Sequence, residues 1–347
     1  MAMSEVLVQV TRGDLVECVH RGSVAVVDVH GRIVFHVGDP WLITYMRSAC
    51  KPIQAMGLFL SGAAESFGLS DAEIAVTCGS HSGQMEHVEA VRDLLAKAQV
   101  PEQELNCGVH APIDKSTRLA LYQRGGDPSE VHCNCSGKHA GMLAICAQMG
   151  WGRSGYRFLE HPLQQWLLKQ VGVVSDMATE AIHTAPDGCG VTVHGMPISH
   201  MAFAFARLAS GTGLSEDYRQ AAARVVSAMH AHPLLVAGTG RMCTRLNGLP
   251  GGRFVAKSGA DGVYCIGAVE AGLGIAVKSA EGNGRIAGMV GLEVLNQLGL
   301  LTEADQDTLA DSLRPENRNL VNDIVGQFTP VFSLVPSSLL GYSMKFG

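Results

Sequence analysis

The stretch YMRSACKPIQAM, residues 45–56, places Ser48 three positions before Lys51, where the chain turns into a predicted helix. We expect this helix to run from Ser48 to about Leu60, because Pro52 is tolerated in a first turn whose N–H groups have no helical partner. Residues three apart share a helix face, and a helix N-terminus stabilises developing negative charge. The geometry suits a serine nucleophile with a lysine base, although one S-x-x-K motif is by itself a weak signal.

A second lysine motif, KSG at residues 257–259, lies in a predicted strand late in the chain. The order S-x-x-K, then a serine motif, then K-[ST]-G is that of penicillin-binding proteins and serine β-lactamases. The middle serine here is Ser80 in GSHSG or Ser136 in CSGKH, which also carries Lys138. Three of the eight lysines thus lie beside Ser, Gly or Cys in expected turns. When lysines cluster away from water, their pKa falls until one can act as a base near neutral pH.

Short apolar segments at both ends of the chain predict a sheet. Residues 6–37 alternate or run apolar between the breaks RGD, RGS and HGR, which predicts antiparallel strands. Three further strands are expected at 252–259, 262–270 and 273–282. A capping box is expected at 70–73, and helices at 84–98, from about 138, and at 161–171, 196–210, 216–232 and 285–299.

This order of strands, helices, strands and helix predicts an α+β fold with an antiparallel sheet flanked by helices. A parallel doubly wound sheet is disfavoured because strict alternation of strands and helices is missing. We expect residues 1–347 to form a single catalytic unit of two interlocked lobes. The sheet lobe would comprise about 6–45 and 250–330, and the helical lobe about 46–249.

Composition limits the classes of partner. The chain has 32 acidic and 26 basic residues, so no nucleic acid partner is expected, because phosphate binding needs a basic face. The sequence has no leader with a basic start and an apolar core, and no run of about 18 apolar residues, so we expect no membrane partner and a cytoplasmic location. The ten cysteines are then expected to be reduced thiols.

Two short segments, HCNCSGKH at 132–139 and DGCGV at 187–191, each present cysteine in a glycine-rich turn. Thiolates are zinc ligands, but a C-x-x-C repeat and paired histidine spacing are missing. From the spacing alone, small buried thiols are the favoured interpretation.

The chain resembles the bacterial class 3 L-asparaginases of the Rhizobium etli type, also called the asparaginase II family, in seven ordered motifs: MRSACKPIQA, CGSHSG, CNCSGKHAGMLA, HPLQ, DGCGV, HPLLVAGTGR and KSGADGVY. The resemblance covers about residues 6–330, and seven motifs in order are far more specific than any one of them. It implies a fold similar to that of serine β-lactamases and glutaminases, hydrolysis of L-asparagine to L-aspartate and ammonia, and a homodimer.

The resemblance also implies roles for individual residues. The two Ser–Lys pairs of the active site fall on Ser48 with Lys51 and on Ser80 with Lys257. The zinc site of the family, made of two cysteines and a lysine, falls on Cys135, Lys138 and Cys189.

We expect Ser48 to be the nucleophile and Lys51 its base, with Ser80 and Lys257 relaying protons or binding the tetrahedral intermediate. In this hypothesis Lys257 also lowers the pKa of Lys51 by like-charge repulsion, and the roles of the two serines could be exchanged. Zinc would hold the substrate or polarise its carbonyl.

Three neighbours of the motif residues are candidate substrate contacts. Arg47 and His139 would contact the substrate carboxylate, and Asp187 would contact its ammonium group.

Other functions remain open on the residues alone. A glutaminase or a β-lactam-type serine acyl hydrolase would also carry S-x-x-K and K-S-G. A thiol-based zinc or redox binding protein would depend on the cysteines and not on the serines. The ordered serine, lysine and glycine motifs favour the enzyme. The last residues, 331–347, do not resemble the family and are assigned no function.

Overall fold

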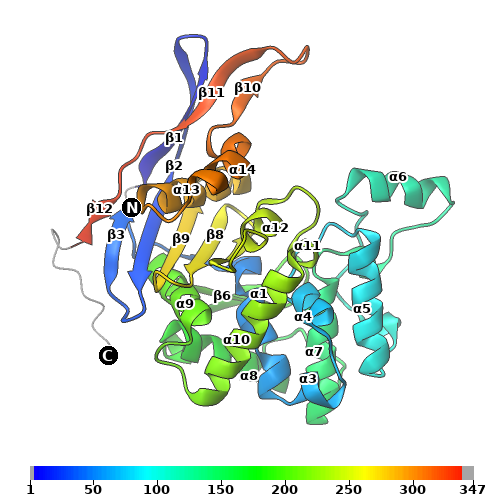
Figure 1. Cartoon of the computed structure of the whole chain (residues 1–347). Coiled ribbons are helices and arrows are strands. Elements are labelled where there is room, and N and C mark those ends of the chain that lie inside the picture. Colours follow the sequence, from blue (N-terminus) through cyan, green and yellow to red (C-terminus); the bar gives the residue numbers. More distant parts are fainter. Residues whose placement is uncertain (1–3, 338–347) are drawn as a thin grey trace.

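The long strand β2 (Leu15–Asp28) joins the strands from the two ends of the chain. The computed structural model describes residues 4–337. Along one edge, β2 pairs first with β1 (Glu5–Arg12) and then with β3 (Ile33–Val37); along the other it pairs with β9 (Leu273–Ser279). All of these pairings are antiparallel, so strands far apart in the sequence share one sheet (Figure 1).

The described strands of this sheet follow the order β10–β11–β1–β2–β9–β8–β7; off this path, β3 pairs with β2, and β12 pairs with β3. The strands not yet bounded are β7 (Phe254–Gly259), β8 (Val263–Ala268), β10 (Glu316–Arg318), β11 (Ile324–Pro330) and β12 (Val335–Pro336). Strand β7 is therefore an edge strand. Strands β1, β2, β10 and β11 project from the body as an arm (Figure 1). Strands β10 to β12 are not predicted from the sequence, and β12 lies in the segment to which we assign no function; residues 338–347 of that segment lie outside the described residues.

Helices fill most of the chain between the two groups of strands. They are α1 (Lys51–Ala55), α2 (Gly57–Leu60), α3 (Ala63–Ser66), α4 (Asp71–Thr77), α5 (Met85–Lys97), α6 (Lys115–Gln123), α7 (Ser136–Met149), α8 (Pro162–Ser175), α9 (Ile198–Ser210), α10 (Glu216–Ala231), α11 (Pro233–Val236) and α12 (Met242–Asn247), followed after β9 by α13 (Gly284–Gln297) and α14 (Glu303–Leu313). The predicted capping box is confirmed, because Ser70 and Glu73 each accept from the other's backbone N–H. None of the helices within residues 4–337 combines the length and apolar character needed to span a bilayer.

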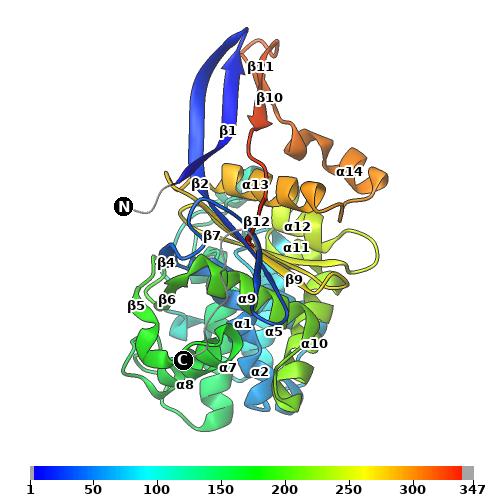
Figure 2. The ribbon, with the colours of Figure 1, turned by 90° about the vertical axis from the view of Figure 1, so that its left-hand side faces the viewer.

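Helices α9 and α13 cover opposite faces of the sheet. A Cβ at Gly274 of β9 would lie 1.7 Å from Ala202 O, so α9 can approach that strand only because the residue is glycine. On the other face, a Cβ at Gly291 of α13 would lie 3.1 Å from the Ile266 side chain of β8. Figure 2 shows α13 and α9 on the two sides of the strands. The predicted antiparallel sheet flanked by helices is confirmed.

Two local predictions are wrong. The helix expected from Ser48 to Leu60 is broken into a 3-10 turn (Arg47–Cys50) and the short helices α1 and α2. The helix expected from Met196 begins two residues later, because Pro197 has extended backbone angles (φ −56°, ψ 142°) and ends strand β6 (Thr192–Pro197). This strand lies between β4 (Ile43–Tyr45) and β5 (His183–Pro186) in a second, small sheet that the sequence patterns do not predict.

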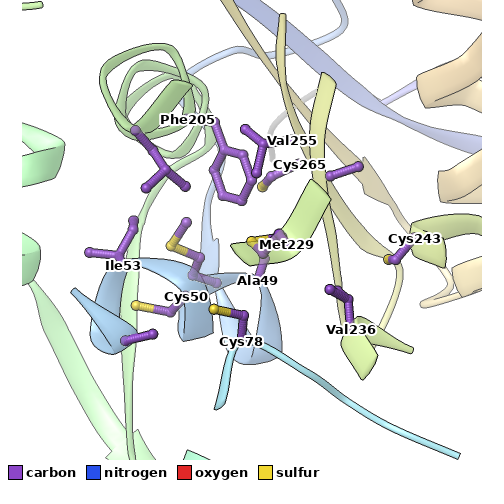
Figure 3. Close-up of a cluster of buried hydrophobic side chains, with 14 of the residues drawn as sticks. Ala49, Cys50, Ile53, Cys78, Phe205, Met229, Val236, Cys243, Val255 and Cys265 are labelled. Carbon is purple, nitrogen blue, oxygen red and sulfur yellow. The ribbon is translucent and has the colours of Figure 1, made fainter. Parts of the chain in front are cut away.

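A buried apolar cluster joins the sheet to the segments that carry the predicted catalytic serines (Figure 3). Its side chains come from β7, β8, α9, the 3-10 turn, α1 and the residue after α4: Val255, Cys265, Phe205, Ala49, Cys50, Ile53 and Cys78. Interiors of this kind are close-packed, so the cluster fixes the spacing between these segments.

Helix α7 approaches the end of α4 at a glycine, and this contact generates a stability prediction. A Cβ at Gly137 would lie 2.2 Å from Val76 O. We expect Gly137→Ala to lower the free energy of unfolding by about 1–3 kcal/mol through overpacking, measured by urea denaturation.

The matched control is Gly288→Ala in α13, where the nearest atom to the new Cβ lies at an ordinary 3.6 Å. This substitution should raise the free energy of unfolding by about 0.5–1 kcal/mol, because alanine loses less backbone freedom than glycine on folding. Equal effects of the two substitutions would contradict the close approach of α7.

Candidate active site

The hydroxyl of Ser80 lies between two buried lysine amines. Lys51 Nζ donates to Ser80 Oγ at 2.9 Å, and Lys257 Nζ lies 3.1 Å from the same oxygen. Lys51 is 1% exposed and Lys257 0% exposed. The structure therefore brings together three of the four residues predicted to be catalytic.

Backbone contacts hold Ser80 in this position. The residue lies just beyond the end of α4, and its N–H donates to Val236 O at 2.9 Å. A Cβ at the preceding Gly79 would lie 2.6 Å from Leu235 O, so only glycine allows the two backbones to approach this closely. This close approach explains why the GSHSG motif begins with glycine.

Lys257 lies on strand β7 of the large sheet. Lys257 lies opposite Cys265 of β8, and opposite residues in neighbouring strands point to the same face. That face is the one covered by α9, because Cys265 and Phe205 share the apolar cluster (Figure 3). A Cβ at Gly259 would lie 2.6 Å from Met46 O, so the glycine of KSG lets β7 pass close to the turn that carries Ser48.

Burial lowers the pKa of Lys257 to about 7. Burial is the largest cause of this shift. The positive charges of Lys51 and Arg241 lower the pKa of Lys257 further, whereas Cys243 raises it. An amine with this pKa is largely neutral just above neutral pH and can accept a proton from a hydroxyl.

Ser48 lies apart from this hydrogen-bond network. It is partly buried in the 3-10 turn. The backbone N–H of Lys51 donates to Ser48 O, but among residues 4–337 no hydrogen bond joins the Ser48 hydroxyl to the Lys51 amine. Besides Ser80, Lys51 Nζ contacts Gly79 O at 2.6 Å and Cys135 Sγ at 3.3 Å. The amine expected to pair with the first serine therefore contacts the second.

The thiol of Cys135 is the acidic member of a sulfur cluster beside Lys51. Hydrogen bonds from Cys133 and Cys189 hold the pKa of Cys135 well below its usual range, against the effect of burial, and the cations Lys51 and Lys138 act in the same direction. All ten cysteines of the chain are free thiols. A Cys135 thiolate would supply negative charge next to a buried ammonium group.

The three residues predicted to bind zinc lie together. Lys138 Nζ lies 3.1 Å from Cys189 Sγ, and Cys189 shares a hydrogen bond with Cys135. Burial alone would lower the pKa of Lys138, but interactions with the neighbouring sulfurs of Cys189 and Cys135 raise it above its usual value. Within residues 4–337 no group of three His, Cys, Asp or Glu side chains could hold a metal, so a site here needs the lysine nitrogen. Two sulfurs and one nitrogen suit zinc, and the residues fit it.

The predicted substrate contacts Arg47 and Asp187 are paired with each other. Arg47 Nε donates to Asp187 Oδ1 at 2.7 Å, and its Nη1 pairs with the carboxylate of Asp261. Arg47 also has a left-handed backbone (φ 52°), which is unfavourable for a residue other than glycine. The guanidinium of Arg47 thus already has two carboxylate partners.

His139 is completely buried in α7. Its Nδ1 lies 2.6 Å from the Tyr156 hydroxyl, while its Nε2 has no hydrogen-bond partner among the described residues. Burial, followed by the charge of Lys138, holds the pKa of His139 well below its usual range, so its ring is neutral.

The family model for L-asparaginase II matches residues 8–330 of the chain. The chain belongs to the L-asparaginase II family. Membership makes it an amidohydrolase, and the match ends where the sequence ceases to resemble the asparaginases. No curated protein matches the chain significantly.

Among solved structures, the chain is similar to crystal structures of Mglu. One Mglu structure has 16% sequence identity and a TM-score of 0.36, with 81% of this chain and 67% of Mglu covered. The glutamate form of Mglu has 14% identity and a TM-score of 0.34, with 81% of this chain and 61% of Mglu covered. The chain thus spans about two thirds or less of the length of these Mglu chains.

Sequence reasoning missed two neighbours of the cluster formed by Ser80, Lys51 and Cys135 in this asparaginase-family chain. Arg241 Nη1 donates to Ser80 O at 3.0 Å, and Cys133 hydrogen-bonds to Cys135. Both residues lie within family motifs quoted above, HPLLVAGTGR and CNCSGKHAGMLA. The motifs therefore marked these positions but did not indicate what Arg241 or Cys133 contacts.

The environment of Lys257 generates a titration prediction. In protein carrying ¹³C-labelled lysine, one side-chain resonance should titrate with a midpoint near pH 7, because burial favours the neutral amine. That resonance should be missing from the spectrum of Lys257→Met. If every lysine resonance titrates above pH 9, the inferred environment of Lys257 is wrong.

Proposed function

We propose that the protein hydrolyses L-asparagine to L-aspartate and ammonia, with Ser80 as the nucleophile. The observation that carries this proposal is the position of Ser80 Oγ between two buried amines, Lys51 and Lys257. Membership of the L-asparaginase II family supports the substrate. The geometry favours Ser80 over Ser48, because among the described residues only the Ser80 hydroxyl is hydrogen-bonded to lysine amines.

In the proposed mechanism, Lys257 is the general base. Its neutral amine takes the proton of Ser80 Oγ while that oxygen attacks the side-chain amide carbon of the substrate. The resulting ammonium of Lys257 then returns a proton to the departing nitrogen, so that ammonia leaves and an ester to Ser80 remains. Water, deprotonated by the same amine, hydrolyses the ester and releases aspartate.

Lys51 supplies positive charge in this scheme. Its ammonium group donates to Ser80 Oγ and lies 3.3 Å from Cys135 Sγ. A buried ammonium needs a counter-charge, which the Cys135 thiolate provides. Lys51 therefore stabilises the developing alkoxide of Ser80, while Lys257 moves the proton.

Cys135, Lys138 and Cys189 are the residues that would hold zinc. When bound, the metal would supply a Lewis acid that polarises the substrate carbonyl. Lysine and cysteine ligate only after losing their protons, so zinc affinity should fall as pH falls.

The first test of function is ammonia release from L-asparagine and L-glutamine by the wild type and four variants. Ser80→Ala should lower kcat/KM for L-asparagine at least about a thousand-fold. Ser48→Ala, which removes at most one hydrogen bond to the substrate, should lower it no more than about tenfold. The matched control is Ser154→Ala at an exposed serine, which should leave the rate unchanged. If Ser48→Ala abolishes turnover and Ser80→Ala does not, the nucleophile is Ser48.

The fourth variant, Lys257→Arg, tests the pH dependence. A base must be deprotonated, so kcat/KM should rise about tenfold per pH unit below pH 7 and level off above it. Arginine stays protonated, so Lys257→Arg should lose the activity at every pH. A wild-type profile that is flat from pH 5 to 8 would exclude Lys257 as the base.

A separate test addresses zinc without using activity. After dialysis against zinc, the wild type should hold about one zinc ion per chain. The variants Cys135→Ala and Cys189→Ala should hold almost none. The control is Cys18→Ala, at the exposed thiol. If Cys135→Ala retains as much zinc as the control, the assignment of these ligands is wrong.

A further inference from the structure

A cavity of about 360 Å³ lies beside β7 and is lined by Ser258 and Gly259 of that strand. Successive residues of a strand point to opposite faces, so Ser258 points away from the face of Lys257 and shares the face of Tyr264. The residues that line the cavity include Arg241, Cys243, Ser258, Tyr264, Arg285 and Ser312. They come from the start of α12, from β7 and β8, and from α13 and α14.

Two glycines of α13 leave the cavity open. Gly284 and Gly288 both line it, and residues four apart lie on the same helix face. A Cβ at Gly284 would meet no atom within 4 Å, and one at Gly288 would first meet Met242 at 3.6 Å. The open space is therefore bordered by backbone at the first turns of a 14-residue helix.

The charge of the cavity is positive. Two arginines line it, and none of the lining residues in the described part of the chain is acidic. Arg241 donates to Ser80 O and, within residues 4–337, forms no ion pair. The Arg285 guanidinium stacks on Phe328, 4.5 Å from the ring centre, and likewise has no carboxylate partner among these residues. Nearby Arg245, in contrast, pairs with Asp311.

A buried hydroxyl faces the same space. Tyr264 is 1% exposed, and its OH has no nitrogen or oxygen partner within the described residues; its one side-chain hydrogen bond is to the Cys243 thiol. Arg241 and Cys243, which also line the cavity, are among the charged and titratable neighbours of this hydroxyl. A thiol is only a weak hydrogen-bond partner for a buried hydroxyl, and a ligand oxygen would supply a stronger one.

We propose that this cavity binds the carboxylate of an amino acid, with Arg241 as its anchor and Tyr264 as a second donor. Guanidinium groups bind carboxylates through two parallel hydrogen bonds, and Arg241 has donors left after its contact with Ser80. Arg47, the sequence-predicted carboxylate contact, already has two carboxylate partners. The inference deepens the proposed function but does not require turnover.

The carboxylate has two possible sources. The first is the substrate itself, because β7 is the edge strand and Arg241 reaches the backbone of Ser80 around it. The second is another amino-acid molecule, which would act on Ser80 through Arg241. Both sources use the same chemistry at the cavity, and the kinetics below distinguish them.

The test is calorimetric titration with L-aspartate. The wild type should bind it, and Arg241→Gln should raise the Kd at least about tenfold, because hydrogen bonds to a charged group are lost. Tyr264→Phe should raise the Kd less and should change the Tm little, since the only protein hydrogen bond lost with the hydroxyl is the weak one to the Cys243 thiol. The matched control is Arg224→Gln, at an exposed arginine that stacks on Phe59, and it should bind as the wild type does.

Competition with L-asparagine identifies the source. Purely competitive inhibition by L-aspartate and a raised KM in Arg241→Gln indicate the carboxylate of the substrate; non-competitive inhibition indicates a second molecule. Both results support the cavity as a carboxylate site. The inference is overturned if Arg241→Gln and Tyr264→Phe keep their Tm and bind L-aspartate as tightly as Arg224→Gln. A wild type that binds L-aspartate through Arg241 but releases no ammonia would refute only the proposed function.

Discussion

Two lysine amines and one serine hydroxyl share a space from which water is almost excluded, and the rest of the site follows from that constraint. Two ammonium ions cannot both be stable so close together in a buried environment. The free-energy costs of burying a charge and of the repulsion between the two amines both fall when the amine of Lys257 gives up its proton. In the proposed mechanism the amine of Lys51 carries the positive charge. Two chemically identical side chains thus supply a base and an electrostatic stabiliser in that mechanism, because their surroundings differ.

The charge that remains on Lys51 needs an anion, and the sulfur cluster supplies it. Cys135 contacts Lys51 directly and is held as a thiolate by hydrogen bonds from two other thiols. The same sulfur belongs to the proposed zinc ligands. The metal site and the serine site are therefore not independent, since a change in the charge on Cys135 acts on Lys51 and, through it, on Ser80. Replacing one partner of such a buried network usually leaves the other partner uncompensated.

The sequence predicted which segments carry the residues of this site better than it predicted which of these residues contact one another. The strand that carries Lys257 and the glycine-rich segment that carries Ser80 were identified from short motifs. The expected contact of Ser48 with Lys51 assumed a regular helix, whereas the chain forms a 3-10 turn followed by one short helix, and the long lysine side chain extends to acceptors on another segment. The small sheet was missed because strands of three to six residues give little periodicity. Arg241 was missed because its contact with Ser80 spans 161 residues, which no local pattern records.

The distances along the chain between the members of the serine site have a consequence for how the protein reaches its active state. Lys51 and Ser80 are 29 residues apart, but Ser80 and Lys257 are separated by 177. Contacts of such long range close large loops, and they form late because the entropy of the chain opposes them until much of the fold is present. During synthesis, the segment with the first serines and lysine leaves the ribosome long before β7 does. The nascent polypeptide consequently holds Ser80 without Lys257, and the proposed chemistry becomes possible only after β7 has joined the fold.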